Sequence, residues 1–269
     1  MKKKILKFIK DSAYKFGYSI IGNWQLKDLE LSVHTRDLFS LLNIECVLDV
    51  GANKGQYRDF LRNEIGFEGQ IFSFEPVSHL AKNLEERAKS DLKWQIFKIA
   101  LGSKNGKFSI NINKGDTLHS FLDSAKSQPD SRWFENNKVL GKEDVLVKTL
   151  DDFIKEISFK IPLNKTFIKL DTQGFDLDVL EGGKNSLIEI AALQTEISIL
   201  PIYENMPDFR QTIDILNANN FQITGLIPVT WDKWLRLIEM DCLAINYGLI
   251  KKLKIRGETK SGVMANSGV

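Results

Sequence analysis

Four carboxylates in this sequence stand at or near the ends of short apolar runs. They are Asp49, Glu75, Asp171 and Glu196. Short apolar runs bounded by turn residues are typical of buried strands, and open α/β sheets bind their ligands beyond the carboxyl ends of the strands. Burying a charge without a partner is costly, so four acids at one edge indicate a binding site. Each acid alone could instead cap the helix that follows it.

A turn with two glycines follows the first of these runs. The chain reads Gly51-Ala-Asn-Lys-Gly55, and a helical pattern and a second apolar run then lead to Glu75. This order predicts a nucleotide-binding βαβ unit whose terminal acid accepts both ribose hydroxyls. Asn53 replaces the middle glycine of a dinucleotide turn, and the Gly-Lys-Ser/Thr run of a P-loop is missing. A ligand with ribose and no phosphate fits best, and S-adenosylmethionine is the common one; the alternative is a plain βα turn.

The remaining pattern predicts an α/β fold with a doubly wound, mostly parallel seven-stranded sheet. The expected strands are 46–50, 70–74, 94–100, 166–170, 193–199, 221–227 and 241–246. The expected helices are 26–42, 56–63, 79–89, 175–188 and 208–217. No clear helix separates the last two strands, so we expect them to pair as an antiparallel edge.

Residues 102–148 break this alternation. An alternating run at 108–112 predicts a half-exposed strand, and 114–133 is polar with several turn signals. Long irregular segments inside a domain are usually functional or mobile, so we expect a substrate-side segment, with disorder as the alternative. His119 is its only histidine; it could act as a base, although a lone loop histidine is more often plain surface.

The termini and the composition bound the remaining possibilities. Residues 1–25 begin with a basic, amphipathic stretch, which suits either an interfacial helix on an anionic membrane or a helix packed on the domain. Residues 251–269 are rich in Lys, Gly and Ser, so we expect a disordered tail. The net charge of +2 gives no indication of nucleic-acid binding. Cys46 and Cys242 predict buried, reduced thiols of a cytoplasmic protein, not a disulfide or a metal pair.

The sequence resembles the FkbM-type methyltransferases over about residues 46–247. Five blocks occur in that family's order: Asp49-Val-Gly-Ala-Asn-Lys-Gly55, Phe74-Glu-Pro76, Ala100-Leu-Gly102, Thr149-Leu-Asp-Asp152 and Ile168-Lys-Leu-Asp-Thr-Gln-Gly174. The resemblance implies a Rossmann-like methyltransferase fold and S-adenosylmethionine-dependent O-methylation of natural products or of sugars in surface glycans. Many relatives have Glu where Asp176 stands, which puts a role for that side chain in doubt.

We expect the first blocks to bind the cofactor. Glu75 would hold the ribose, while Gly51 and Gly55 would let the chain pass close to the methionine part. Asn53 would offer its amide, and Asp49 would hold the ammonium group directly or through water. Ala52 and Pro76 belong to the same two turns, and the resemblance places the adenine near Ala100 and Leu101, whose backbone would read the base.

The catalytic candidates are Asp171, Glu196 and His119. Asp171 lies where the transferred methyl group should be, and it could orient the acceptor hydroxyl, act as base or bind a cation. Gln173 and Tyr203 are the substrate-binding candidates from the fourth-strand block and a later loop. No ligand set for a metal is identified, and a divalent metal at Asp171 stays open.

Two other classes of function compete with methyl transfer to a small-molecule or glycan hydroxyl. A nucleic-acid methyltransferase acting on amines needs a polar-Pro-Pro-aromatic loop after the fourth strand, but Asp171-Thr-Gln-Gly174 stands there. A binding module without catalysis is disfavoured by the intact Gly51, Gly55 and Glu75. We therefore expect no nucleic-acid partner and a cytoplasmic location, with peripheral membrane contact through the N-terminus as an open alternative. The oligomeric state cannot be inferred.

Overall fold

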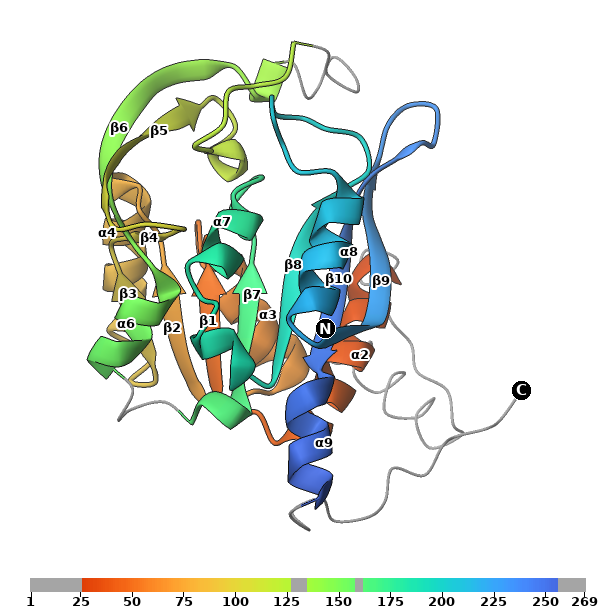
Figure 1. Cartoon of the computed structure of the whole chain (residues 1–269). Helices are drawn as coiled ribbons and strands as arrows, with labels where there is room; N and C mark the ends of the chain where they lie inside the picture. The colour runs from red at the N-terminus through yellow and green to blue at the C-terminus, as the bar shows by residue number, and fades with distance from the viewer. Residues whose placement is uncertain (1–25, 127–134, 158–161, 256–269) are drawn as a thin grey trace, which may run out of the picture.

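Seven strands form one sheet at the centre of the computed structural model, which describes residues 26–126, 135–157 and 162–255 (Figure 1). Their order is β3-β2-β1-β7-β8-β10-β9. The bounds are β1 Cys46–Val50, β2 Gln70–Phe74, β3 Trp94–Phe97, β7 Thr166–Leu170, β8 Ala192–Ser198, β9 Phe221–Trp231 and β10 Leu237–Asn246. β1, β2, β3, β7 and β8 pair in parallel, and β10 runs antiparallel to both β8 and β9. The predicted doubly wound sheet with an antiparallel last strand is confirmed.

Helices cover both faces because the central strands bury side chains on both faces. Val47 of β1 packs with α2 (Leu26–Leu42), α3 (Gln56–Phe60) and the π-helical turn Leu61–Ile65. Its neighbour Leu48 packs on the other face with α6 (Leu150–Ile157), α7 (Asp176–Glu181) and α8 (Phe209–Ala218). Strand order reverses between β1 and β7, which leaves a crevice at their carboxyl ends.

A second sheet curves over that edge (Figure 1). It has the order β4-β6-β5, with β4 at Ala100–Leu101, β5 at Gly106–Asn113 and β6 at Val139–Lys148. The strand predicted at 108–112 is confirmed within β5, and β6 is a further strand of the inserted segment that the sequence did not predict. The third strand was predicted to reach Ala100, but it ends at Phe97, and Ala100 and Leu101 leave the main sheet to pair with β6.

Other boundaries also differ from the sequence prediction. The helix expected at 175–188 ends at Glu181, and Gly182 follows, where a side chain would lie 2.0 Å from Gly102 O. Helix α6 was not predicted. Helix α9 (Tyr247–Ile255) continues five residues into the expected disordered tail, whereas the N-terminal prediction and residues 256–269 lie outside the described residues.

The thiols of Cys46 and Cys242 are free and buried as expected, and burial raises the pKa of each to about 12. Among the described helices, none combines the length and the apolarity needed to cross a membrane.

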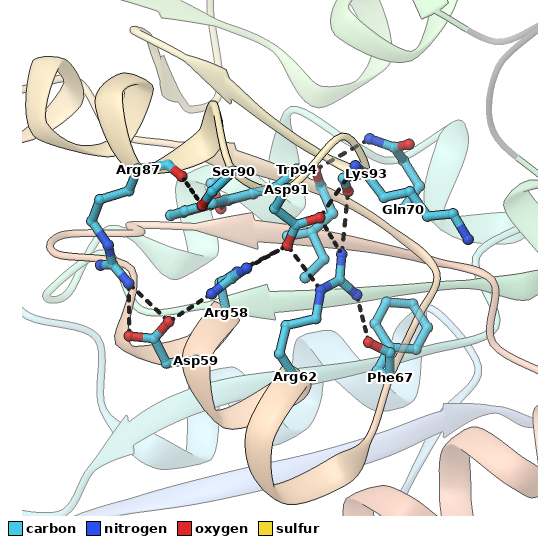
Figure 2. A network of polar contacts seen from close by, with 12 residues as sticks. Arg58, Asp59, Arg62, Phe67, Gln70, Arg87, Ser90, Asp91, Lys93 and Trp94 are labelled. Atoms are coloured by element: carbon cyan, nitrogen blue, oxygen red, sulfur yellow. Dashed lines mark hydrogen bonds and ion pairs between the residues drawn. The ribbon is translucent and has the colours of Figure 1, made fainter.

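Two arginines fasten the helix after β1 to the turn before β3 (Figure 2). The Asp91 carboxylate accepts hydrogen bonds from Arg58 Nη2 at 2.6 Å and from Arg62 Nε at 3.0 Å. Arg62 also donates to the carbonyls of Phe67 and Gly69. Asp91 is largely buried, and its hydrogen bonds to these arginines hold its pKa at about 2 against burial. This network fixes the position of the helix that carries the glycine turn.

We expect Asp91→Asn to lower the free energy of unfolding by about 1–3 kcal/mol, because two guanidinium groups lose a charged acceptor. The contribution is present above the unfolded pKa and is lost as pH falls from about 4 to about 2, so the deficit of the variant should shrink at low pH. Urea unfolding at several pH values measures this. Glu86→Gln, which removes a fully exposed pair with Lys89, should leave the free energy of unfolding unchanged.

Candidate functional site

A cavity of about 520 Å³ lies at the carboxyl ends of the parallel strands. The β1–α3 turn, the ends of β2, β7 and β8, and β10 form its floor and sides, and the inserted segment contributes residues 117–121. Its size falls in the usual range of small-molecule sites, roughly 300–1,000 Å³. Most of the predicted site residues line it, but Asp49, Gly55 and Tyr203 do not.

The register of the sheet explains how polar residues from distant parts of the chain meet here. Asp49 stands opposite Ser73 on one side and Lys169 on the other, and Lys169 stands opposite Gln194. Side chains repeat every second residue along a strand, so a second row follows two residues later. That row is Glu75, Gly51, Asp171, Glu196 and Asp241. The buried row supports the row that faces the cavity.

Gly51 lets the ends of β1 and β7 come together. Its φ is +82°, and a side chain here would lie 2.0 Å from Asp171 O. Its N–H donates to Phe74 O, and Ala52 N–H donates to the same oxygen. Gly51 and Ala52 line the cavity as predicted. Gly55, with φ +80°, instead packs against Leu84 and Trp94 outside the cavity, so its glycine serves the helix packing.

Glu75 is buried at the rim of the cavity with its carboxylate held in place. Oε2 accepts from Asn53 N–H at 2.8 Å, and Oε1 accepts from Val77 N–H at 2.9 Å. Each oxygen keeps a second lone pair, so the group can still accept two hydroxyls. Burial, opposed by these two backbone bonds, raises the pKa of Glu75 to about 7.

The other predicted cofactor residues divide into two groups. Pro76, Ala100 and Leu101 line the cavity, and part of the β4 backbone is used by the ladder with β6. Asn53 lines it too, but its Nδ2 donates to Asp116 O at 2.5 Å. One N–H of this amide thus ties the inserted segment to the turn, and the Asn53 backbone orients Glu75. Whether the second N–H serves the ligand stays a prediction.

Lys169 is the buried cation beneath the acids, and sequence reasoning missed it. Its Nζ lies 2.8 Å from Asp171 Oδ2 and 4.0 Å from Asp49 Oδ1. Burial raises the pKa of Asp49, whereas Lys169 lowers the pKa of Asp171 despite burial. Asp171 therefore faces the cavity as a carboxylate. Asp49 lies one row deeper, where Ser73 Oγ donates to it at 2.9 Å, and it does not reach the cavity.

The polar groups of Gln173 and Tyr203 form hydrogen bonds within the protein, so few of their donors and acceptors remain for a substrate. Gln173 Nε2 donates to Asp171 Oδ1 at 2.9 Å and to Glu196 Oε2 at 3.3 Å. The Tyr203 hydroxyl lies 2.9 Å from Gln173 Oε1 and is fully buried. Ser120 Oγ donates to Gln173 O at 2.7 Å. Gln173 has a φ of +55° in the tight turn after β7, so this network holds an unusual backbone in place.

Glu196 shares its end of the cavity with Glu239 and Asp241 of β10, which the sequence reasoning did not select. Glu239 is 4% exposed, and its Oε1 has no hydrogen-bond partner. Burial, with repulsion from Asp171 and Asp241, raises the pKa of Glu239 to about 8. Burial, with repulsion from Glu239 as the next cause, raises the pKa of Glu196 strongly. Gln194 donates to Asp241 at 2.9 Å. This end is therefore rich in acceptors and contains no cation except Lys169 among the lining residues that the structure describes.

Asp176 has a structural role. Its carboxylate accepts from Thr172 N at 2.8 Å and from Thr195 Oγ1 at 2.7 Å. These bonds fix the turn after β7 and tie it to β8.

His119 lines the cavity, but its ring is oriented poorly for a base. Its Nδ1 accepts from Asn113 N–H at 3.1 Å, so the neutral ring carries its proton on Nε2. That atom is buried without a partner. Burial lowers the pKa of His119, which keeps the ring neutral. In this arrangement His119 can donate a hydrogen bond but has no free lone pair.

His79, Asp116 and His119 each place a potential ligand atom within 4.8 Å of the others. Within the described part of the chain no other three metal-ligating side chains converge so closely. Lys54 Nζ, however, lies 2.7 Å from Asp116 Oδ2, and His119 Nδ1 is occupied. Both contacts disfavour a cation at this cluster.

The family model of the methyltransferase FkbM domain matches residues 49–223. This chain belongs to the FkbM methyltransferase family. The 2-O-methyltransferase NoeI of Sinorhizobium fredii is 29% identical over 205 residues, which cover 74% of this chain and 81% of NoeI.

Solved structures show weaker similarity. The FkbM methyltransferase of Methylobacillus flagellatus KT has 21% identity and a TM-score of 0.46, and the match covers 75% of this chain and 43% of that one. This chain thus spans less than half of that protein. Aeropyrum pernix fibrillarin, solved with S-adenosylmethionine, has 10% identity and a TM-score of 0.43, with 80% and 73% covered. The family assignment rests on the sequence match alone.

S-adenosylmethionine is the methyl donor that the sequence predicts for this FkbM methyltransferase. The cavity fits it, since a buried carboxylate with free lone pairs at Glu75 suits a ribose diol. The close approach at Gly51 leaves backbone bordering the cavity where a polar chain can lie, and Ala100 and Leu101 offer an apolar wall for a base.

We expect S-adenosylmethionine affinity to rise between about pH 6 and about pH 8, because the charged form of Glu75 accepts stronger bonds from both hydroxyls. In the free protein, the contribution of Glu75 to folding stability has the opposite pH dependence. It is present at low pH and is lost as pH rises through the raised pKa of about 7. Calorimetric titration at several pH values measures the affinity. Glu75→Gln should weaken binding at least about tenfold at pH 8 and flatten the profile; an unchanged profile in a folded variant would remove Glu75 from the site.

Proposed function

We propose that this FkbM methyltransferase transfers its methyl group to a hydroxyl of a sugar, of a glycan or of a natural product. The observation that carries the proposal is Asp171, a carboxylate facing the cavity and kept ionised by Lys169. A hydroxyl must lose its proton as it attacks, and it needs an acceptor within hydrogen-bond reach. The name of NoeI, a 2-O-methyltransferase, agrees with an O-directed reaction.

The residues of this chain position the acceptor more than they activate it. Bound S-adenosylmethionine supplies a methyl group that is already electrophilic, so in-line placement of the hydroxyl provides much of the rate. Asp171 accepts a hydrogen bond from the acceptor hydroxyl. Lys169 donates to one oxygen of the Asp171 carboxylate at 2.8 Å, and Gln173 donates to the other at 2.9 Å. Because both oxygens are hydrogen-bonded, the carboxylate is held in a single orientation.

The acceptor end favours a ligand with several O–H or N–H donors and no negative charge. Glu196 has a single donor at 3.3 Å, and Glu239 Oε1 has none. Buried acceptors left without donors cost free energy, so a bound acceptor that supplies hydroxyls relieves this cost. Sugars have such hydroxyls on adjacent carbons.

We expect Asp171→Asn to keep S-adenosylmethionine affinity within a few-fold and to lower turnover by about 10²–10⁴. The change removes the charge and keeps one oxygen. Asp214→Asn, an exposed acid on α8, should behave as the wild type. Turnover on a cell-derived glycan fraction, followed by mass shift, is the readout. Full turnover by the Asp171→Asn variant would exclude Asp171 from the reaction. If Mg²⁺ stimulates the wild type and does not stimulate the variant, Asp171 is a metal ligand.

Acceptor charge provides a second test. At about pH 9, above the pKa of about 8 of Glu239, a neutral sugar should be methylated with a kcat/KM at least about tenfold above that of the matching uronic acid, because ionised acids in a buried site repel a further carboxylate. The double change Glu196→Gln and Glu239→Gln should narrow that gap. A uronic acid used as well as the neutral sugar would contradict the proposed role of these acids.

A further inference from the structure

The turn between β9 and β10 exposes two large apolar side chains. Trp234 is 72% exposed and Leu235 is 82% exposed. The turn is nevertheless well ordered by its own hydrogen bonds, because buried Asp232 accepts from Trp234 N at 2.8 Å, from Arg236 N at 2.9 Å and from Arg236 Nε at 2.6 Å. The tip therefore presents these side chains in a defined geometry.

The backbone at the tip adopts a conformation that leucine avoids. Leu235 has a φ of +60°, a left-handed region that is unfavourable for residues with a side chain. Glycine or asparagine would adopt it at lower cost. Since Leu235 gains no burial within the described structure, neither packing nor turn geometry accounts for a leucine here.

The tip stands at the same edge as the cavity. β9 is antiparallel to β10, and β10 is antiparallel to β8, so β9 ends where β8 ends. Val229 and Glu239, on the two strands of the hairpin, both line the cavity. Figure 1 shows the loop between β9 and β10 projecting beyond the ends of the strands.

The charges around the tip are positive. Lys233 lies over the Trp234 ring, with Nζ 5.4 Å from its centroid, and the Arg236 side chain is 58% exposed. Asp232, which precedes both of them, is buried and paired with Arg236, so Lys233 is the cation of the tip without an acidic partner among the contacts described. Trp and Leu with flanking Lys and Arg are typical of side chains at a lipid interface, where the apolar part inserts and the cations meet anionic headgroups.

We propose that residues 231–236 form a membrane-contacting tip, in which Trp234 and Leu235 insert into the surface of an anionic bilayer. Two side chains form too small a patch for a stable protein interface, which buries about 1,200 Å² or more in total, and a bilayer has no such requirement. The contact would face the mouth of the cavity toward the membrane. It does not depend on the identity of the acceptor.

The test compares binding of the full chain to vesicles of phosphatidylcholine with about one-third phosphatidylglycerol. The double change Trp234→Ser and Leu235→Ser should weaken partitioning at least about tenfold without lowering the melting temperature. Leu92→Ser is the matched control, because Leu92 is 95% exposed, precedes a lysine and lies before β3 at the opposite edge of the sheet. The control should bind as the wild type does.

A second measurement locates the contact. Vesicles containing brominated lipid should quench the fluorescence of the wild type. Trp234→Phe should still bind and should lose the part of the quenching that does not come from Trp231, which is 42% exposed in the same tip. Equal vesicle binding by the double serine variant and the wild type would overturn the proposal. So would a double variant that changes the sedimentation of the free protein from dimer to monomer, because the tip would then be an interface between copies.

Discussion

The buried ammonium group of Lys169 is the interaction on which the site depends. It lies under a row of carboxylates at the centre of a parallel sheet. Without it the buried Asp49 would have no countercharge, and Asp171, which faces the cavity, would lose its ion pair. Removing one partner of a buried pair is expensive, at about 3–5 kcal/mol. One cation thus determines that Asp171 is ionised, and it leaves the acids farther along the row, Glu196 and Glu239, without a countercharge.

The inserted segment completes the site from above. Asn53 of the glycine turn bonds to Asp116, Ser120 bonds to the turn after β7, and Tyr203 connects that turn to Leu118. Three segments that are far apart in sequence are therefore joined by hydrogen bonds above the ends of the strands. The inserted segment, which departs most from the doubly wound pattern, thus borders the cavity.

The two ends of the cavity have different chemistry for a physical reason. At β2, Glu75 is held by two backbone N–H groups, which suits recognition of a diol. At β8 and β10, antiparallel pairing brings Glu239 and Asp241 beside Glu196, a concentration of acids that a purely parallel sheet would not produce at this place.

The sequence by itself determined the sheet, most helices and the acids at the strand ends, because strand and helix periodicity and the glycine turn are local signals. It also indicated Glu75, since an acid after the second strand of a βαβ unit has one geometric role. Only the tertiary structure decided which polar atoms remain available: Asn53 and Tyr203 are used internally, His119 has no free lone pair, and Gly55 serves packing. Lys169 and Glu239 became visible only there, because their roles arise from register between strands distant in sequence, and a single chain read along its length contains no signal for that register.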